Sequence, residues 1–246
     1  MAAIAVVTGA SGGLGQAMVR ELRQDGWTVA LVGRDRERLQ ATFELDGPCI
    51  AADVSTSEGA RTAVESCQRE VGLPTALAHC AGTTLLAPLH RTSPEMYRSC
   101  LAANLDSAFY MLGAFVDALR EARQPGAAVL VSSVVARIGV ANHEAIAAAK
   151  AGVEGLVRAA AATYAPSRIR VNAVAPGIMD TPAVARIIGN DASRAGAAKQ
   201  YPLPGIGDPA DLARLMAWLL SDRAGWITGQ VWAMDGGFSS VRPLVK

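Results

Sequence analysis

The sequence predicts an α/β fold, in which a doubly wound parallel sheet of about seven strands carries helices on both faces. Short apolar runs alternate with longer amphipathic segments from one end of the 246-residue chain to the other. The short runs are continuously apolar, which is typical of parallel strands that helices cover on both sides. Hydrophobic residues make up 51% of the chain but aromatic residues only 5%, as expected where small aliphatic side chains let helices pack closely on a sheet.

The strand-like runs are each bounded by glycine, proline or polar residues, and they lie at residues 4–8, 28–33, 48–52, 76–80, 127–132, 170–174 and 230–234. The amphipathic segments between them predict helices near residues 14–25, 35–45, 56–71, 94–122, 143–165 and 208–220. No linker or repeat divides the chain, so we expect a single domain over residues 1–246. The least regular stretch, residues 180–207, follows a predicted strand end, where α/β folds place loops that cover ligands.

Charge and cysteine content exclude several classes of protein. The formal net charge is +1, so the chain has no electrostatic footprint for nucleic acid or an anionic membrane surface. High hydrophobicity also excludes a disordered chain. The four cysteines, Cys49, Cys67, Cys80 and Cys100, form no CxxC pair and have no histidine pair at metal-ligand spacing. We therefore expect reduced thiols, no metal site and a cytoplasmic location.

A glycine-rich turn, Thr8-Gly9-Ala10-Ser11-Gly12-Gly13-Leu14-Gly15, joins the first strand to the first helix. Glycines there let the backbone approach a pyrophosphate, whose charge the helix N-terminus stabilises. The same residues fit GxSxG, the nucleophile turn of α/β-hydrolases, with Ser11 as nucleophile. That fold builds part of its oxyanion hole from an earlier loop, and only ten residues precede Ser11. Dinucleotide binding is the favoured interpretation, with hydrolysis as an alternative.

Further motifs follow in order along nearly the whole chain: Ala52-Asp53-Val54, Ala81-Gly82, Asn104, Ser132-Ser133, Lys150, the run from Arg170 to Gly177, Thr181, and Thr228-Gly229-Gln230 through Asp235-Gly236-Gly237. In these motifs the chain resembles the short-chain dehydrogenase/reductase family. The resemblance implies a Rossmann-like fold, a nicotinamide cofactor across the strand ends, a small-molecule substrate, and a homodimer or homotetramer with no membrane association.

The resemblance also implies the residues that hold the cofactor. Asp53 would bond the adenine, Pro176-Gly177-Ile178 would flank the nicotinamide, and Thr181 would meet the cofactor phosphate or amide. The full predicted set is Gly9, Ser11, Gly13, Leu14, Gly15, Arg34, Asp53, Val54, Ala81, Gly82, Lys150, Pro176, Gly177, Ile178 and Thr181.

The end of the second strand favours NADP over NAD. An enzyme that uses NAD usually places a carboxylate there to accept from the ribose hydroxyl, but this position holds Gly33. Arg34 follows, and a guanidinium can pair bidentately with the additional phosphate of NADP. Arg34 could instead be part of a solvated, charged helix start, which leaves NAD as the alternative.

The catalytic pattern of the family is broken at one position. In the family a serine, a tyrosine and a lysine cooperate, and Ser133 and Lys150 occupy the serine and lysine places, with Asn104 expected to position a relay water. The tyrosine place, four residues before Lys150, holds Ile146. Loss of a positioned general acid generally costs roughly 10²–10⁴ in rate.

Three explanations of Ile146 remain open. His143 lies one helical turn earlier, on the same predicted face as Lys150, and a neutral imidazole can donate a proton through its N–H; Asn142 would cap that helix. Alternatively, the protein catalyses a reaction that needs no tyrosine and uses the bound dinucleotide, or Ser133 and Lys150, in a different way, such as a non-redox reaction on the same fold. A third possibility is a sensor or partner subunit that binds a dinucleotide without turnover.

A second departure is His79-Cys80, where the family usually has two asparagines before Ala81-Gly82. A thiol hydrogen-bonds more weakly than an amide, so local packing must differ there. Adjacent side chains on a strand point to opposite faces, so we do not expect these two residues to act as a nucleophile and base pair.

Overall fold

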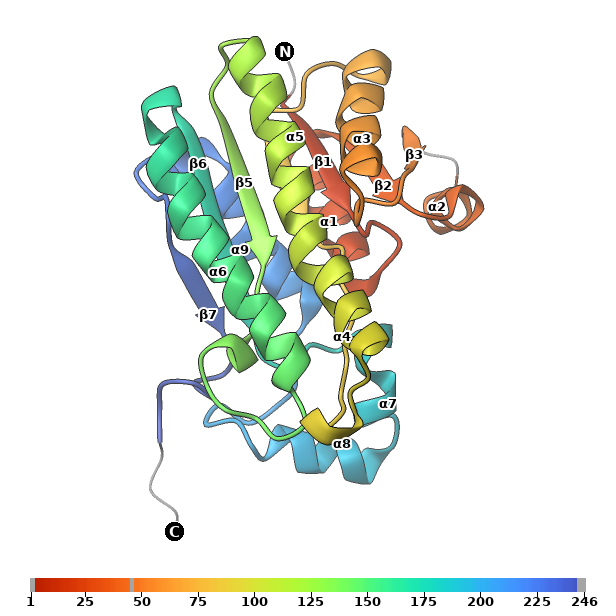
Figure 1. Cartoon of the computed structure of the whole chain (residues 1–246), viewed down its shortest axis with the longest axis vertical. Coiled ribbons are helices and arrows are strands. Elements are labelled where there is room, and N and C mark those ends of the chain that lie inside the picture. The colour runs from red at the N-terminus through yellow and green to blue at the C-terminus, as the bar shows by residue number, and fades with distance from the viewer. Residues whose placement is uncertain (1–2, 45–46, 243–246) are drawn as a thin grey trace.

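The fold is a seven-stranded, wholly parallel sheet between two layers of helices, as the sequence predicts (Figure 1). The computed structural model describes residues 3–44 and 47–242. The spatial order of the strands is β3-β2-β1-β4-β5-β6-β7, so the chain winds outward from β1 first in one direction and then in the other. Their bounds are β1 Ile4–Thr8, β2 Thr28–Gly33, β3 Cys49–Ala51, β4 Ala76–His79, β5 Gly126–Val131, β6 Ile169–Pro176 and β7 Val231–Met234.

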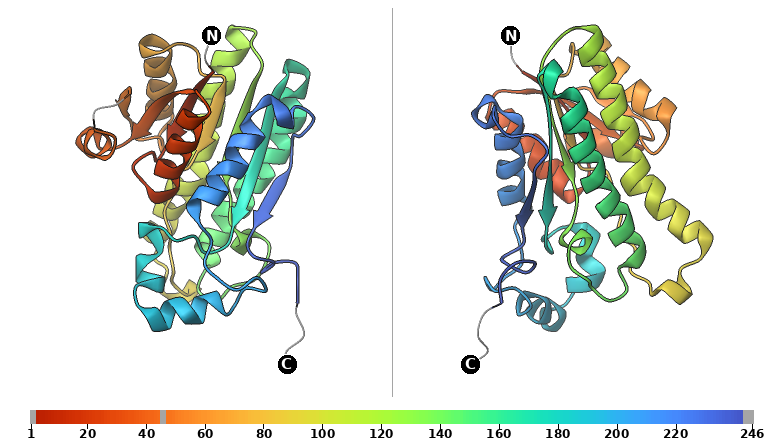
Figure 2. Two further views of the ribbon diagram at one scale, coloured as in Figure 1. Left: turned by 180° about the vertical axis from the view of Figure 1, so that it is seen from behind. Right: turned by 60° about the vertical axis from the view of Figure 1, so that its left-hand side comes forward.

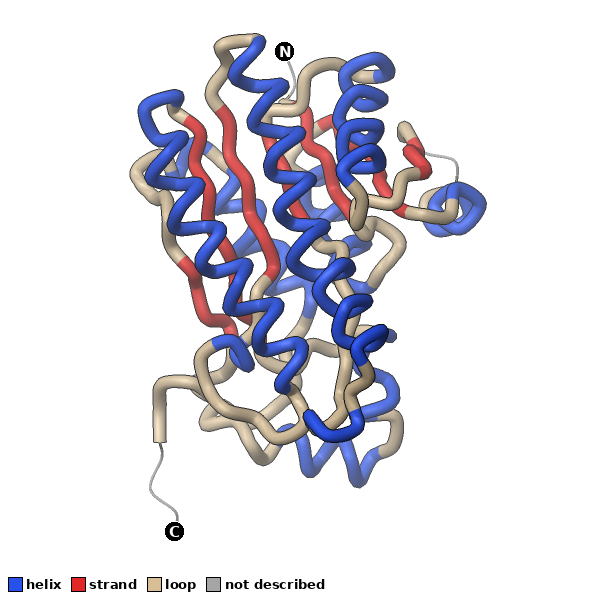
Figure 3. Tube along the Cα trace, viewed as in Figure 1, coloured by secondary structure: helices blue, strands red, loops and turns tan. Residues whose placement is uncertain are grey.

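Helices α3, α5 and α6 cover one face of the sheet, and helices α1 and α9 cover the other (Figure 2). Short helices α7 and α8 lie beyond the carboxyl ends of the strands, at the bottom of Figure 3. The bounds are α1 Gly13–Gln24, α2 Arg36–Thr42, α3 Ser57–Glu70, α4 Pro94–Leu101, α5 Ser107–Glu121, α6 Glu144–Tyr164, α7 Ala185–Ile188, α8 Asp191–Ala198 and α9 Pro209–Leu220.

The hydrophobic core has one part on each face of the sheet, because successive strand residues point in opposite directions. On β4, Leu77 packs with Phe115 in the part beneath α3, α5 and α6. Its neighbour Ala78 packs with Leu212 in the part beneath α1 and α9. All four side chains are completely buried. This burial on both faces explains why the strands are continuously apolar in the sequence.

The element bounds differ from the predictions in a few places. The predicted helix 94–122 is interrupted by a π-helical segment, η2 Ala102–Asp106. The stretch 180–207, predicted to be irregular, contains α7 and α8. The predicted helix 35–45 ends at Thr42 in the structure, and its residue 45 lies outside the described residues. The other elements agree to within two residues at each end.

One helical run, Pro94–Glu121, is long and apolar enough to cross a membrane by length and composition alone. In this fold the run belongs to the layer of helices on one face of the sheet, and its residues Ala108, Met111 and Phe115 are buried against the sheet. Core helices of globular domains pass the same test, so we assign the apolar content of this run to the core.

The connection between β6 and β7 is fixed by Asn172, a completely buried residue. Its amide nitrogen donates to the Ile227 carbonyl at 2.9 Å, and its oxygen accepts from the Gln230 backbone at 3.1 Å. The Gly177 N–H then donates to the Met234 carbonyl at 3.1 Å. These bonds hold the end of β6, and the segment that follows it, at the edge of the candidate site.

Candidate active site

A cleft of about 930 Å³ opens at the carboxyl ends of β1, β2, β3 and β4. Loops at this edge of a doubly wound sheet commonly bind ligands, especially where the strand order reverses direction. The reversal here is between β1 and β4. Seven of the predicted cofactor-binding residues line this cleft together: Gly9, Ser11, Arg34, Asp53, Val54, Ala81 and Gly82.

The glycine loop has no room for side chains at two of its positions. Gly9 has a φ of 62°, and a Cβ there would lie 2.9 Å from backbone atoms of Ala81. At Gly15 a Cβ would lie 2.2 Å from the Gly9 carbonyl oxygen. The loop therefore fits tightly between β4 and the first turn of α1, which leaves its outer side to the cleft.

Gly13 and Thr181 meet across the cleft edge, although 168 residues separate them in sequence. A Cβ at Gly13 would lie 2.8 Å from Thr181 Cβ. Leu14, by contrast, packs its side chain against the core beneath α1 and α9, so any contact it makes with a ligand would come from its backbone. Thr181 thus lies beside the glycine loop, and its contact with a cofactor phosphate or amide stays a prediction.

Charged groups stand at the tips of β2 and β3. Asp53 accepts from the Ser55 N–H at 3.1 Å and from its hydroxyl at 2.7 Å. These bonds, helped by the Arg34 guanidinium, lower the pKa of Asp53 despite its partial burial. Asp35 caps α2 by accepting from the Arg38 N–H at 3.0 Å, and both Asp35 and Arg38 line the cleft. Arg34, which precedes α2, and Arg38, in its first turn, both line this end of the cleft, and their guanidiniums make it favourable for an anion.

Asn104 and Lys150 converge on Gly82 at the floor of the cleft. A Cβ on Gly82 would lie 2.8 Å from Asn104 Oδ1 and 3.6 Å from Lys150 Nζ. Asn104 lies in the π segment, and its amide nitrogen donates to the Cys100 carbonyl at 2.9 Å. Lys150 Nζ donates to the Val131 carbonyl at 2.8 Å, and burial lowers the pKa of this amine to about 8.

Ser133 follows β5 and caps the short 3-10 helix η3 Val134–Ala136. Its hydroxyl oxygen accepts from the Val135 N–H at 3.4 Å. Ser133 and Lys150 are thus both tied to the end of β5, Ser133 by sequence and Lys150 through Val131.

Ile146 is buried, with 4% of its surface exposed. It forms a small apolar cluster with Ala145 and Cys100, and Leu85 and Val135 pack against this cluster. Leu85 and Cys100 also line the cleft. Ile146 is therefore packed in an apolar cluster, of which Leu85 and Cys100 face the cleft.

His143 begins α6 as its N-terminal capping residue, without a capping bond from its side chain. Its Nδ1 donates to the Ala141 carbonyl at 2.7 Å, since a carbonyl oxygen can only accept. The neutral ring then has no hydrogen on Nε2. The prediction that Asn142 caps this helix is wrong: Asn142 is one residue too early, with a left-handed φ of 64°, and turns the chain into the helix.

His79 and Cys80 point to opposite faces of the sheet, as predicted. His79 is 2% exposed and lies on the α5 side, where its Nε2 is 3.1 Å from Ser107 Oγ. Because Ser107 gives its hydrogen to the Ala103 carbonyl, His79 donates from Nε2, and Nδ1 accepts from Thr8 Oγ1 at 2.9 Å. Burial lowers the pKa of His79 to about 3, and Cys80 packs on the α1 and α9 side. His79 is a neutral link between β1, β4 and α5.

The segment Pro176-Gly177-Ile178 meets a residue that sequence reasoning missed, Tyr201. The Ile178 N–H donates to the Tyr201 hydroxyl at 2.7 Å, and a Cβ on Gly177 would lie 2.8 Å from the Tyr201 ring. Burial raises the pKa of this hydroxyl. Tyr201 lies in the stretch 180–207, which has no periodic pattern to point to it.

Arg38 and Cys100 are two further cleft residues that the sequence reasoning missed. Cys100 lies four residues before Asn104 within the predicted helix 94–122, so helical spacing is a signal that could have found it. Arg34 precedes α2, so this spacing does not relate Arg38 to it. Among the residues that the structure describes, no three His, Cys, Asp or Glu side chains are grouped to hold a metal ion.

The comparisons with known proteins agree with this geometry. Residues 9–239 match the model of a family described as enoyl-(acyl carrier protein) reductase. The chain is 34% identical over 241 residues to 3beta-hydroxysteroid dehydrogenase 1 of Eggerthella lenta, covering 95% of this chain and 92% of that protein. It is 33% identical over 240 residues to a 3-oxoacyl-(acyl-carrier-protein) reductase of Pseudomonas aeruginosa, covering 95% and 96%.

A solved structure of a short-chain type dehydrogenase/reductase from Mycobacterium ulcerans superposes with a TM-score of 0.90 at 28% identity. The superposition covers 96% of this chain and 90% of that one. Fold, motif order and relatives lead to one assignment: the chain belongs to the short-chain dehydrogenase/reductase family, whose members are oxidoreductases that use NAD(H) or NADP(H).

Proposed function

We propose that this chain is an NADP(H)-dependent oxidoreductase with an altered active centre, which interconverts a carbonyl and an alcohol on a small molecule. The observation that carries the proposal is the single cleft in which the glycine loop, Arg34, Asp53 and Gly82 lie together, with Asn104 and Lys150 beside Gly82. A homodimer or homotetramer and a cytoplasmic location belong to the same proposal. The named substrates of the relatives, a hydroxysteroid among them, favour an apolar alcohol or ketone.

The residues present fit a dinucleotide. The glycine loop and the start of α1 would hold the pyrophosphate, Asp53 and Val54 the adenine, and Pro176, Gly177, Ile178 and Thr181 the nicotinamide end. When bound, the cofactor supplies or accepts a hydride. Ser133 would donate a hydrogen bond to the substrate oxygen, Lys150 would hold the ribose hydroxyls and support proton transfer, and Asn104 would position a water.

The proton that a carbonyl reduction consumes would come through Lys150 or from His143. Among the described residues, the Val131 carbonyl is the acceptor that Lys150 Nζ bonds, and the pKa of about 8 lets Lys150 give up a proton near neutral pH. His143 uses its Nδ1 hydrogen on Ala141, so it would have to donate from Nε2 as the imidazolium.

Arg34 tests the cofactor preference. We expect Arg34→Ala to weaken NADPH binding by roughly 10- to 100-fold, because the variant loses a charge-assisted hydrogen bond to the additional phosphate. Binding of NADH, which lacks this phosphate, should stay unchanged. Arg36→Ala is the matched control, because Arg36 is an exposed arginine at the start of the same helix. Titration calorimetry with both cofactors measures this. Tighter binding of NADH than NADPH by the unaltered protein contradicts the NADP preference.

Turnover is tested by following NADPH absorbance with a panel of ketones and aldehydes. Loss of absorbance that depends on the carbonyl compound supports the oxidoreductase. A second candidate function is cofactor binding without turnover, as in a sensor or partner subunit, and the apolar surroundings of Ile146 favour it. Tight cofactor binding with no turnover across the panel would select this second function, or a non-redox reaction on the same fold.

A further inference from the structure

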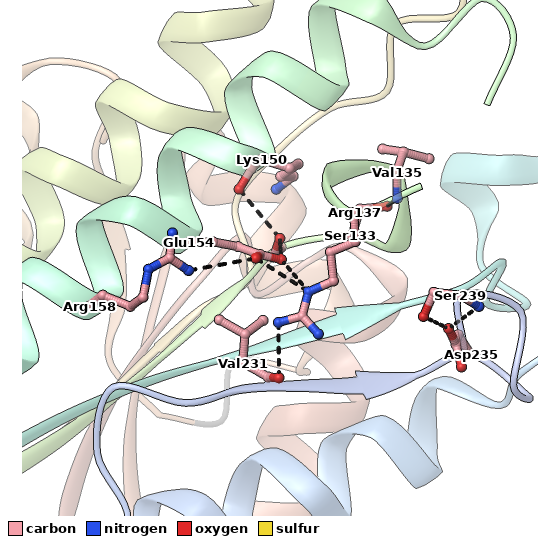
Figure 4. A network of polar contacts seen from close by, with 10 residues as sticks. Ser133, Val135, Arg137, Lys150, Glu154, Arg158, Val231, Asp235 and Ser239 are labelled. Carbon is pink, nitrogen blue, oxygen red and sulfur yellow. Dashed lines mark hydrogen bonds and ion pairs between the residues drawn. The ribbon is translucent and has the colours of Figure 1, made fainter. Parts of the chain in front are cut away.

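A buried carboxylate lies one helical turn beyond Lys150 on α6. The side chain of Glu154 is 9% exposed, and its Oε1 accepts from the Ser132 hydroxyl at 3.1 Å. Arg137 Nε donates to the same carboxylate, at 3.0 Å to one oxygen and 3.3 Å to the other (Figure 4). We call Glu154, Arg137 and Ser132 the Glu154 clamp.

The Glu154 clamp also reaches β7. Arg137 directly follows η3, and its Nη2 donates to the Val231 carbonyl at 3.1 Å. One guanidinium therefore connects the segment after β5, helix α6 and strand β7. Arg158 approaches the same carboxylate at 3.9 Å, but its side chain is 61% exposed.

Ser133 lies inside this arrangement. Ser132 immediately before it and Arg137 four residues after it are both bonded to Glu154. Lys150, on the same helix as Glu154, donates to the carbonyl of Val131, the last residue of β5. The segment 131–137 is thus attached to α6 at both of its ends, and Ser133 has little freedom to move relative to Lys150.

We propose that Glu154 and Arg137 are positioning residues, which hold Ser133 at the place relative to Lys150 that catalysis needs. This inference rests on the proposed function, because it takes Ser133 and Lys150 as the catalytic pair. Arg137 keeps 35% of its side chain exposed while Glu154 loses most of its hydration, so the ion pair adds little to the stability of the fold. What Arg137 and Glu154 contribute instead is a fixed position for the segment 131–137, which carries Ser133.

The test compares Arg137→Met and Glu154→Gln with Arg158→Gln, a matched control that removes a neighbouring charge without touching the segment. In the first two variants we expect kcat to fall by about tenfold or more, since small displacements of catalytic groups are costly, while KM for the cofactor stays within about twofold. Hydrogen exchange of the amides of residues 135–138 should become faster in the same two variants. Arg158→Gln should change neither quantity by more than about twofold.

Three outcomes overturn parts of the proposal separately. Unchanged amide exchange in both variants would show that the Glu154 clamp does not hold the segment. Faster exchange with unchanged kcat would show that the clamp is structural and has no catalytic consequence. If the unaltered protein turns over no carbonyl compound, the proposed function and the positioning role fail together, while the exchange measurement still decides whether the clamp exists.

Discussion

At the scale of single residues, Ile146 is where the proposed catalytic centre departs from a serine, tyrosine and lysine pattern. Counting back four residues from Lys150 finds this position in the sequence, but its surroundings come from three other segments of the chain. Cys100 comes from α4, Leu85 from the loop after β4, and Val135 from η3. The structure thus shows an apolar cluster around Ile146, which counting along the sequence cannot show.

Replacing Ile146 by tyrosine tests whether a general acid is what the site lacks. We expect Ile146→Tyr to raise kcat toward the roughly 10²–10⁴-fold that a positioned acid provides. Ile146→Phe is the matched control, with the same added bulk and no hydroxyl. Both variants should lose about 1–3 kcal/mol of stability, because the position is well packed. Steady-state NADPH oxidation separates them, and equal rates in the two variants would refute the need for a hydroxyl.

The lowered pKa of Lys150 should make the free energy of unfolding depend on pH. Its pKa is about 8 in the folded protein, against an ordinary value of 10.5, so above pH 8 the unfolded chain binds more protons than the folded one. The free energy of unfolding should therefore rise with pH, by about 1 kcal/mol between pH 7.5 and 9, and more toward pH 10.5. Urea titrations of the protein and of Lys150→Met measure the difference. A rise of equal size in Lys150→Met would mean that another group causes it.

At the scale of elements, periodicity in the sequence located the strands and helices well but not their irregularities. Continuous apolar runs identify β1 to β7 because helices cover both faces of the sheet. The π segment Ala102–Asp106 leaves no trace in the pattern, since it shifts the helical register by one residue within an apolar run. Helices α7 and α8 are short and have few buried residues, so their sequences look like a loop.

His79 joins β1, β4 and α5 through its two ring nitrogens, and we expect the free energy of unfolding to fall in acid because of this residue. The pKa of His79 is about 3 in the fold and 6.5 ordinarily, so below pH 6.5 the unfolded chain takes up a proton that the folded chain does not. Stability should therefore fall by about 2 kcal/mol between pH 7 and pH 5. Chemical unfolding of the protein and of His79→Gln at both pH values tests this. The variant should show a smaller loss, and an equal loss would exclude His79 as the source.

For the molecule as a whole, the two parts of the core share every strand. Leu77 and Ala78, neighbours on β4, pack on opposite faces of the sheet. Loss of either helical layer would therefore expose apolar side chains of the same strands that the other layer packs against. The alternation of apolar runs with amphipathic segments, together with the order of the motifs, was enough to predict this architecture. The site was only partly predictable, because contacts such as Tyr201 with Ile178 join residues that no local pattern relates.

We predict that residues 1–246 unfold as one cooperative unit. Tryptophan fluorescence and far-ultraviolet circular dichroism should give coincident urea transitions, because Trp27 and Trp218 report on the core while dichroism reports on all helices. The measurements belong at a single protein concentration, since assembly shifts apparent stability. Two separated transitions would contradict the single domain.

The π segment makes the residue count of one helix part of the active site. Five residues, Ala102–Asp106, accommodate one more than regular α-helical winding would, and Asn104 lies among them. Deletion of a single residue there would let the run from Pro94 to Glu121 wind regularly, with every buried helical turn retained. It would leave α4 and α5 in place relative to each other, because the π turn absorbs the extra residue, but it would remove the irregular turn in which Asn104 lies. The side chain of Asn104 would then point elsewhere while both flanking helices kept their packing, so the number of residues at this point decides what faces Gly82.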